Sequence, residues 1–216
     1  DGAPQPASQV IDGLPKCHCA RLDRGNRWLL VPTLGVDAIG VYRLGDDLRL
    51  VPGTPAQAVR AGSGPRHLVF SPDNRHVYCV NELDATLDAY AFDAATGGLA
   101  PIQSVALLPA GYAGVPWAAE LRATPDGRFL YASERRASLI VAFVVDAASG
   151  RLAPVERTPT ETQPRGMAGS ASGRWLVCAG QLSSQLTVYA IDAASGRLRP
   201  PGRHATGAGP ICVEAI

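Results

Sequence analysis

Residues 62–92 concentrate side chains that could act on an ester or a lactone. Arg66 and His67 open one short apolar run, and Glu82 ends the next one. A carboxylate or an imidazole can accept a proton from a water molecule that attacks a carbonyl carbon. An arginine can stabilise the oxyanion that then develops, or bind a phosphate through two N–H groups. These residue types therefore indicate acyl hydrolysis by activated water, without a covalent nucleophile.

The sequence gives little support to other catalytic mechanisms. A G-x-S-x-G nucleophile elbow is missing, which excludes an α/β-hydrolase. The spacing of His, Cys and carboxylate residues is not that of a zinc or calcium site. The sequence therefore predicts acyl hydrolysis without a metal ion.

A repeat supplies the elements that must position these side chains. Each of four segments places an arginine before an apolar run, at positions 27, 75, 128 and 174, so that the repeats lie 46 to 53 residues apart. Near copies of one turn, AATGGL, AASGRL and AASGRL, stand at residues 94–99, 147–152 and 193–198. A four-stranded sheet that recurs at such a period is typical of a propeller blade. We predict an all-β fold, a β-propeller with about four four-stranded blades and a terminal strand in this chain.

The rest of the pattern agrees with strands rather than helices. No segment keeps the i, i+3, i+4, i+7 spacing of an amphipathic helix, and the 23 Gly and 18 Pro fall between the apolar runs. Residues 105–117 form a longer link, which is either a surface insertion or a loop that shapes the site. We expect an inner strand at residues 14–22 and another, without partners, at residues 211–216. Four blades could close a small ring, whereas an open arc would expose apolar faces and strand edges.

The starts of the inner strands and the loops between second and third strands of a propeller face its central channel. We place four residues at these positions in a catalytic set: Glu82, His67, Arg135 and His18. Four others form a substrate-binding set: Arg66, Arg165, Glu120 and Asn81. The sequence does not decide which arginine would bind a phosphate and which an oxyanion.

Each of these residues also has a purely structural interpretation. His67 could be a core histidine whose polar atoms are satisfied. Arg66 and Arg165 both follow a proline, so they could cap strand edges or pair with nearby glutamates in a solvated ring. Asn81 could serve a turn. Their recurrence at equivalent blade positions favours a shared site.

The composition limits the partners and the compartment. With 20 Lys+Arg against 19 Asp+Glu the net charge is +1, so attraction to nucleic acid or to an anionic membrane is not expected. The start of the sequence shows no signal-peptide pattern, and no apolar run approaches the roughly 18 residues of a membrane helix. The five cysteines lack metal spacing, and three of them lie inside apolar runs. We therefore expect a cytoplasmic protein, and the sequence carries no indication of its oligomeric state.

The chain resembles the bacterial propeller-type 6-phosphogluconolactonases, a family built on a seven-bladed ring. The resemblance covers about residues 13–216 and is carried by GPRHLVFSPDNRHVYCVNEL, WAAEL, TPDGRFLYASERRASLIVAF, PTETQPRG and GAGP. It implies hydrolysis of 6-phospho-D-glucono-1,5-lactone to 6-phosphogluconate in the oxidative pentose phosphate pathway, without a cofactor. The substrate would be a small anionic phosphosugar lactone. By resemblance, the channel positions of the family fall on His18, Arg66, His67, Glu82, Glu120, Arg135 and Arg165.

The length departs from this family. A seven-bladed member would carry roughly two and a half further blades before Asp1. We therefore expect residues 1–216 to be a single propeller domain that forms the C-terminal portion of a larger ring. Three alternatives stay open: a propeller that only binds or acts as a scaffold, a fragment that no longer catalyses, and a cycloisomerase. The last alternative arises because the fungal 3-carboxymuconate lactonizing enzymes look similar in fold.

Overall fold

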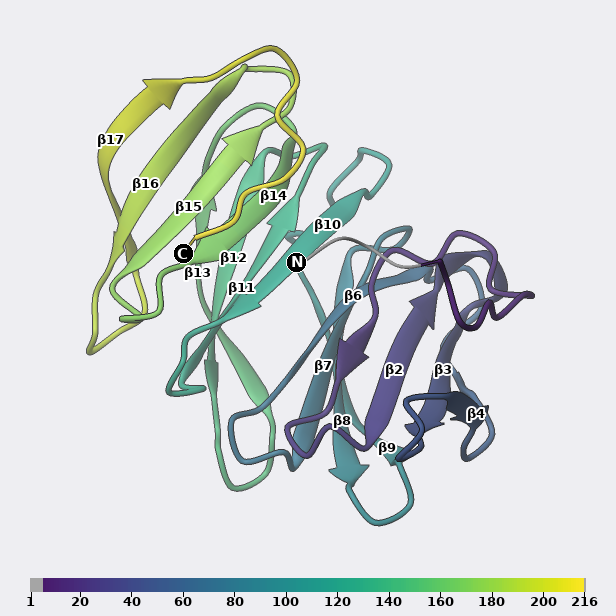
Figure 1. The fold of residues 1–216 in the computed structure, drawn as a ribbon. Coiled ribbons are helices and arrows are strands. Elements are labelled where there is room, and N and C mark those ends of the chain that lie inside the picture. Colours follow the sequence, from purple (N-terminus) through teal and green to yellow (C-terminus); the bar gives the residue numbers. More distant parts are fainter. Residues whose placement is uncertain (1–5, 216) are drawn as a thin grey trace.

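Alternating β-branched and aromatic residues between Gly- and Pro-rich turns form four antiparallel sheets in the computed structural model, which describes residues 6–215. Figure 1 shows these sheets arranged as a fan in chain order. Each sheet is a meander in which consecutive strands are hydrogen-bonded. The first blade consists of β1 (Arg21–Leu22), β2 (Trp28–Thr33), β3 (Ala38–Leu44) and β4 (Leu50–Pro52), with β5 (Gln57–Ala58) paired to β3. A single 3-10 turn, η1 (Leu34–Val36), follows β2.

The other three blades each contain four strands. The second blade consists of β6 (Pro65–Phe70), β7 (His76–Asn81), β8 (Thr86–Asp93) and β9 (Gly98–Ala106). The third consists of β10 (Ala118–Ala123), β11 (Phe129–Glu134), β12 (Leu139–Val145) and β13 (Leu152–Pro159). The fourth consists of β14 (Pro164–Gly169), β15 (Trp175–Gly180), β16 (Gln185–Ile191) and β17 (Leu198–Ala205). The predicted all-β propeller blades are confirmed, and among the described residues no helix is long and apolar enough to cross a membrane.

The repeated arginine ties each blade together and reaches the next one. The backbone carbonyl of Arg75 accepts a hydrogen bond from Phe92 at the end of the third strand, and the same contact recurs in every blade. The guanidinium group of Arg75 donates to the carbonyl of Ala147 in the next blade's turn, at 2.9 Å. Arg128 repeats this contact with the fourth blade. The period seen in the sequence therefore corresponds to a contact between blades.

The aromatic residue that follows this arginine explains the glycine in the repeated turn. Its ring packs directly against the glycine of the next blade. The pairs are Trp28 with Gly97, His76 with Gly150, and Phe129 with Gly196. A Cβ atom on these glycines would lie 2.3 to 2.5 Å from a ring atom, and all three have φ between +71° and +75°. Close approach and left-handed backbone both favour glycine here.

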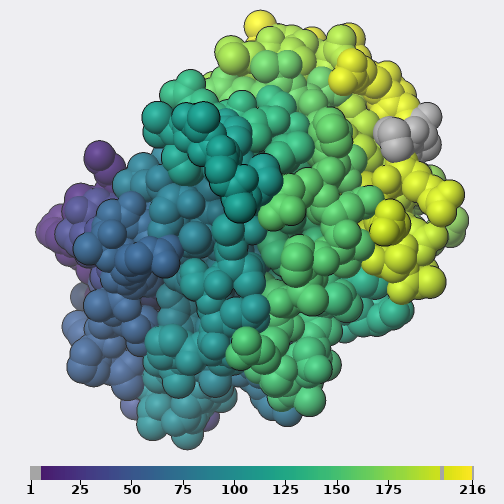
Figure 2. Space-filling model, turned by 180° about the vertical axis from the view of Figure 1, so that it is seen from behind, coloured from purple at the N-terminus to yellow at the C-terminus, as the bar shows by residue number. Residues whose placement is uncertain are grey.

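Apolar clusters fill the three spaces between neighbouring blades. Trp28, Leu30 and Val77 belong to the cluster between the first two blades. Equivalent clusters lie between the second and third blades and between the third and fourth. Each large side chain buried in this way contributes about 1.5–3 kcal/mol. In Figure 2 the colours pass in order across the back of the molecule, because sequence neighbours are also packing neighbours.

A β-bulge interrupts the start of three inner strands, and it positions the polar residues. In β6, Pro65 pairs with Asn81 but His67 already pairs with Val80, so that Arg66 is the extra residue. β14 has the same irregularity at Arg165, and β10 has one between Ala118 and Leu121. A bulge changes the direction in which its side chains point. Among the inner strands, β10 contacts both β6 and β14, so the bulges of neighbouring blades lie near one another.

The two ends of the described chain differ from the predicted inner strands. Only Arg21–Leu22 of residues 14–22 forms a strand, preceded by a single bridge between Cys17 and Thr33. The terminal strand predicted at residues 211–216 is not formed in residues 211–215, and Ile216 lies outside the described residues. Ile211 and Cys212 instead run past Gly166, which has no side chain in their path. A strand needs a neighbour to satisfy its N–H and C=O groups, and this segment has no such ladder.

Candidate active site

Three positions recur in all four blades at the same end of the inner strands. Equivalence follows from the strand registers. In blade order, the bulge position holds His18, Arg66, Ala119 and Arg165. The position after the bulge holds Cys19, His67, Glu120 and Gly166. The residue that follows the second strand is Leu34, Glu82, Arg135 or Gln181. Charged groups are therefore concentrated on the two middle blades.

Glu82 is the centre of the first cluster. Its Oε2 lies 2.7 Å from Arg66 Nε and 2.9 Å from Arg135 Nη2. Its Oε1 accepts a hydrogen bond from the indole N–H of Trp117, at 3.0 Å. Both of its oxygens are therefore occupied by donors. This arrangement makes Glu82 an anchor for two arginines rather than a free acceptor for a water proton.

Trp117 holds the second arginine in place. The guanidinium of Arg135 lies over the indole ring at 3.7 Å, and Arg136 approaches the ring at 4.8 Å. The Trp117 carbonyl accepts a hydrogen bond from Arg135 Nε at 3.2 Å, and its backbone N–H donates to Glu134 Oε1 at 2.5 Å. Trp117 ends the long link at residues 105–117, so this link shapes the site.

Burial makes the protonated, charged form of both arginines less favourable. The side chains of Arg66 and Arg135 are 4% and 3% exposed. Burial lowers the pKa of Arg135 to about 10, against the opposing effect of the Glu82 charge. Burial also lowers the pKa of Arg66, again opposed by Glu82. Carbonyl groups of β10 hold both side chains in position: Arg66 donates to Ala119 at 2.6 Å and Arg135 donates to Ala118 at 2.9 Å.

His67 and Glu120 form the second cluster. His67 Nδ1 lies 2.5 Å from Glu120 Oε1 across the boundary between the second and third blades. Burial alone would raise the pKa of Glu120, but the hydrogen bond and charge of His67 and the charge of Arg122 lower it overall. An ionised Glu120 fixes the N–H tautomer at Nδ1, which leaves Nε2 as a proton acceptor. Among residues 6–215 no side chain binds Nε2, so this imidazole can activate water.

His18 and Arg165 lie at the edge of the two clusters. Partial burial and the charge of Arg66 lower the pKa of His18, and the charges of His67 and Arg165 act in the same direction. His18 is therefore within electrostatic range of the site, on the first blade. Arg165 forms no ion pair with any carboxylate in the described part of the chain. It is the arginine of the predicted set that is available to an external anion.

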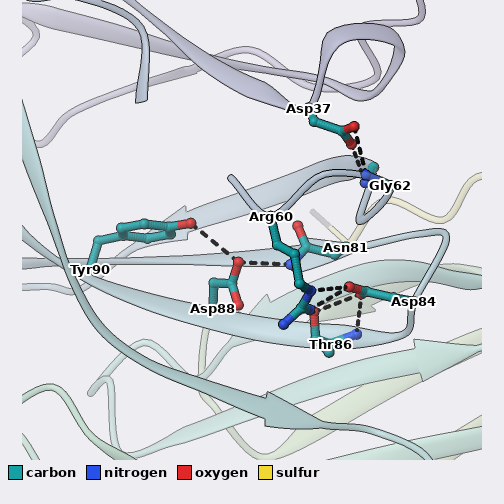
Figure 3. Close-up of polar contacts among 9 residues, drawn as sticks. Asp37, Arg60, Gly62, Asn81, Asp84, Thr86, Asp88 and Tyr90 are labelled. Carbon is teal, nitrogen blue, oxygen red and sulfur yellow. Dashed lines mark hydrogen bonds and ion pairs between the residues drawn. The ribbon is translucent and has the colours of Figure 1, made fainter. Parts of the chain in front are cut away.

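Asn81 belongs to a polar network with residues of β8 (Figure 3). Its Nδ2 donates to Thr86 Oγ1 at 2.9 Å and to Asp88 Oδ2 at 2.8 Å. Tyr90 donates to the same Asp88 oxygen at 3.2 Å. Asn81 is fully buried in this network, and its partners Thr86 and Asp88 lie on β8 of the same blade. The interpretation of Asn81 as a substrate-binding residue finds no support in this placement.

Two residues that the sequence reasoning missed support the site. Asp37 accepts hydrogen bonds from Gly62 and Gly64, both at 2.8 Å, and thereby shapes the loop that leads into β6 (Figure 3). Arg122 lies two residues after Glu120 on the same face of β10 and pairs with it at 3.3 Å. The two-residue period of a strand could have identified Arg122. Asp37 carries no such signal, because its partners are 25 and 27 residues away.

A cavity of about 430 Å³ lies along the inner strands, and its lining includes Arg21, Arg24, Arg122, Val69 and Ala168. Arg122 therefore connects the His67–Glu120 pair to this cavity. Within residues 6–215, no group of three or more His, Cys, Asp or Glu side chains is arranged to hold a metal ion.

Comparison with known proteins gives consistent results. The family model "Lactonase, 7-bladed beta-propeller" matches residues 3–215. The 6-phosphogluconolactonase of Cronobacter sakazakii is 43% identical over 214 residues, which cover 99% of this chain and 64% of the relative. The 6-phosphogluconolactonase of Pectobacterium carotovorum is 44% identical over 168 residues, covering 77% of this chain and 51% of the relative.

A solved structure extends the likeness to three dimensions. The periplasmic gluconolactonase PpgL of Pseudomonas aeruginosa matches with a TM-score of 0.84 and 36% identity, covering 89% of this chain and 55% of that protein. The chain thus spans about half to two thirds of the length of the proteins that it matches.

Proposed function

The chain belongs to the lactonase family of seven-bladed β-propellers, and from this premise we propose that it hydrolyses 6-phospho-D-glucono-1,5-lactone to 6-phosphogluconate. The curated relatives named 6-phosphogluconolactonase support this substrate. The observation that carries the proposal is the His67–Glu120 pair, 2.5 Å apart, together with the two buried arginines that Glu82 holds, Arg66 and Arg135. It combines an acceptor for a water proton with cations for an anionic lactone.

In the proposed reaction His67 Nε2 accepts a proton while the water oxygen bonds to the lactone carbonyl carbon. The carbonyl π pair moves to oxygen and forms a tetrahedral oxyanion. Collapse of this oxyanion breaks the bond between the carbonyl carbon and the ring oxygen. The imidazolium returns its proton to that oxygen, which leaves as the hydroxyl group of the open sugar acid. Ionisation of the new carboxyl group releases one proton per turnover, and no cofactor takes part.

The arginines divide into two groups by their contacts. Arg66 and Arg135 are held by Glu82 and by backbone carbonyls, so their remaining N–H groups have fixed directions. Fixed donors suit an oxyanion that develops at one position. Arg165 has no carboxylate partner among the described residues and suits the phosphate group. His18 lies near the same edge and would help to bind the anionic end.

An excess of positive charge supports a doubly charged substrate. Four arginines, at positions 66, 122, 135 and 165, surround two carboxylates, Glu82 and Glu120. The site would therefore bind a phosphate dianion better than a neutral sugar lactone. All five cysteines are free thiols in the structure, which supports our proposal that the reaction takes place in the reducing cytoplasm.

The proposal is tested by following proton release from the phosphorylated lactone, with the spontaneous hydrolysis rate subtracted. We expect the chain to exceed the spontaneous rate and the His67→Asn variant to lose about 10²- to 10⁴-fold in kcat. The amide keeps a donor for Glu120 but cannot accept the water proton. A wild-type rate equal to the spontaneous rate would overturn the proposed function.

A second measurement addresses the phosphate. Arg165→Met should raise KM for the phosphorylated lactone by about tenfold or more, since a bond to a charged group contributes about 1.5–3 kcal/mol. The same variant should leave KM for unphosphorylated glucono-1,5-lactone almost unchanged. Arg174→Met is the matched control, because Arg174 stands at the repeated arginine position outside the site. Equal effects on both lactones would refute the role assigned to Arg165.

A further inference from the structure

Arg122 connects three blades through the centre of the site. Its Nε donates a hydrogen bond to the carbonyl of Met167 on β14, at 2.8 Å. Its Nη1 lies 3.3 Å from Glu120 Oε1 on its own strand, β10. Glu120 in turn contacts His67 on β6. A continuous chain of polar contacts therefore runs from the fourth blade to the imidazole on the second.

One oxygen atom collects most of these contacts. Glu120 Oε1 contacts His67 Nδ1 at 2.5 Å, Arg122 Nη1 at 3.3 Å and the backbone N–H of Leu121 at 3.1 Å. The carboxylate is 7% exposed, so water can compete little for it. The charge of Glu120 is thus divided between an imidazole and a guanidinium. Any change at Arg122 must alter how strongly Glu120 attracts a proton on His67.

We infer that Arg122 is a positioning residue for the His67–Glu120 pair: it holds the carboxylate in place and limits its pull on the imidazole. This inference rests on the proposed function, in which His67 is the base that activates water. Without Arg122, the whole negative charge of Glu120 would favour the protonated imidazole. A protonated His67 cannot accept a proton. As the pH is lowered, the variant would therefore lose activity at a higher pH than the wild type does.

The other charged groups around His67 do not replace Arg122. Arg66 on β6 and Arg135 after β11 are paired with Glu82. Among the described residues, Arg122 is the only arginine or lysine paired with Glu120. Glu120 contacts the imidazole directly, Arg122 reaches it through Glu120, and His18 lies within electrostatic range of it. Of these, only Arg122 contacts the oxygen that also contacts His67.

The test compares Arg122→Gln, Arg122→Lys and Arg151→Gln. The last variant removes the same charge from an exposed turn of the same blade. The acid limb of the pH profile of kcat/KM is measured between about pH 5 and 8. We expect Arg122→Gln to move this limb upward by about one pH unit, Arg122→Lys to move it by less than half as much, and Arg151→Gln to leave it in place.

A second readout does not depend on activity. The ring-proton NMR signal of His67 is titrated in the same variants, after circular dichroism has shown that each is folded. Its midpoint should rise in Arg122→Gln and stay in Arg151→Gln. If the wild type does not hydrolyse the lactone but the midpoint moves, the proposed function fails and the coupling stands. If the midpoint is the same in the folded Arg122 variants and the wild type, the inference is wrong. Where the glutamine variant does not fold, Arg122→Lys should still raise the midpoint above that of Arg151→Gln, and an unmoved midpoint in folded Arg122→Lys overturns the inference.

Discussion

Replacing Glu82 by glutamine would distinguish two roles of this residue: holding two arginines in place, or acting as a catalytic base. The substitution keeps the size of the side chain and removes its charge. It leaves Arg66 and Arg135 facing a neutral amide, although their side chains are 4% and 3% exposed. Glutamine can still accept the Trp117 N–H through its carbonyl oxygen, so the main loss is the charge shared by two ion pairs.

The size of the effect follows from burial. Removal of one partner from a buried ion pair typically costs about 3–5 kcal/mol, because the remaining charge is left without a partner. In a chain of this length, each kcal/mol lowers Tm by about 2–4 °C. We therefore expect Glu82→Gln to lower Tm by roughly 6–20 °C. Mutual repulsion of the two arginines acts in the same direction.

The assay combines thermal unfolding with lactone hydrolysis. The control is Asp84→Asn, which breaks a pair with Arg60, whose side chain is 55% exposed. Exposed pairs contribute about 0–1 kcal/mol, so this control should move Tm by only a few degrees. If Glu82→Gln unfolds no earlier than Asp84→Asn but loses kcat by the factor expected for His67→Asn, Glu82 acts as the base. That result would refute the reasoning from its ion pairs.

Two further predictions concern the contacts between blades. Gly196→Ala should destabilise the chain by about 1–3 kcal/mol more than Gly111→Ala in denaturant unfolding; both glycines have positive φ, but only the first would place a Cβ 2.4 Å from Phe129. The second prediction concerns the pH dependence of stability. Burial lowers the pKa of His76 below the ordinary value of 6.5, so the unfolded chain binds a proton at this residue more readily than the folded chain does. The free energy of unfolding should therefore fall as the pH drops below 6.5. In His76→Phe this part of the decline in Tm should disappear, and an unchanged decline would contradict the assignment.

The blades could be predicted from the sequence because one contact recurs in each of them. An arginine every 46 to 53 residues marks the start of the second strand, and the glycine turn marks the next blade. These are local signals, so the fold class and most strands follow from them. The strand predicted at residues 211–216 is wrong for the described residues 211–215: their apolar pattern resembles an inner strand, but strand formation also requires a partner.

The sequence indicated which residues form the candidate site, but it did not show which of them pair with one another. Arg66, His67 and Glu120 could be placed at the channel from their blade positions. The sequence could not show that Glu82 is occupied by two arginines whereas Glu120 serves His67. That difference depends on a one-residue bulge in β6 and on contacts between blades. Asn81 illustrates the same limit, because adjacent residues on a strand point to opposite faces.

The repeat separates the residues that build the ring from those that could do chemistry. Ring-building contacts lie at the repeated arginine and at the aromatic residue after it, which face the turn of the next blade. The bulge residues make no such repeated contact, so they can differ between blades: His18, Arg66, Ala119 and Arg165 occupy equivalent positions. Substitution at a bulge should therefore alter binding or rate more than stability, except where the side chain is already part of a buried pair. Arg66 is that exception, because its buried ion pair with Glu82 should also stabilise the second blade.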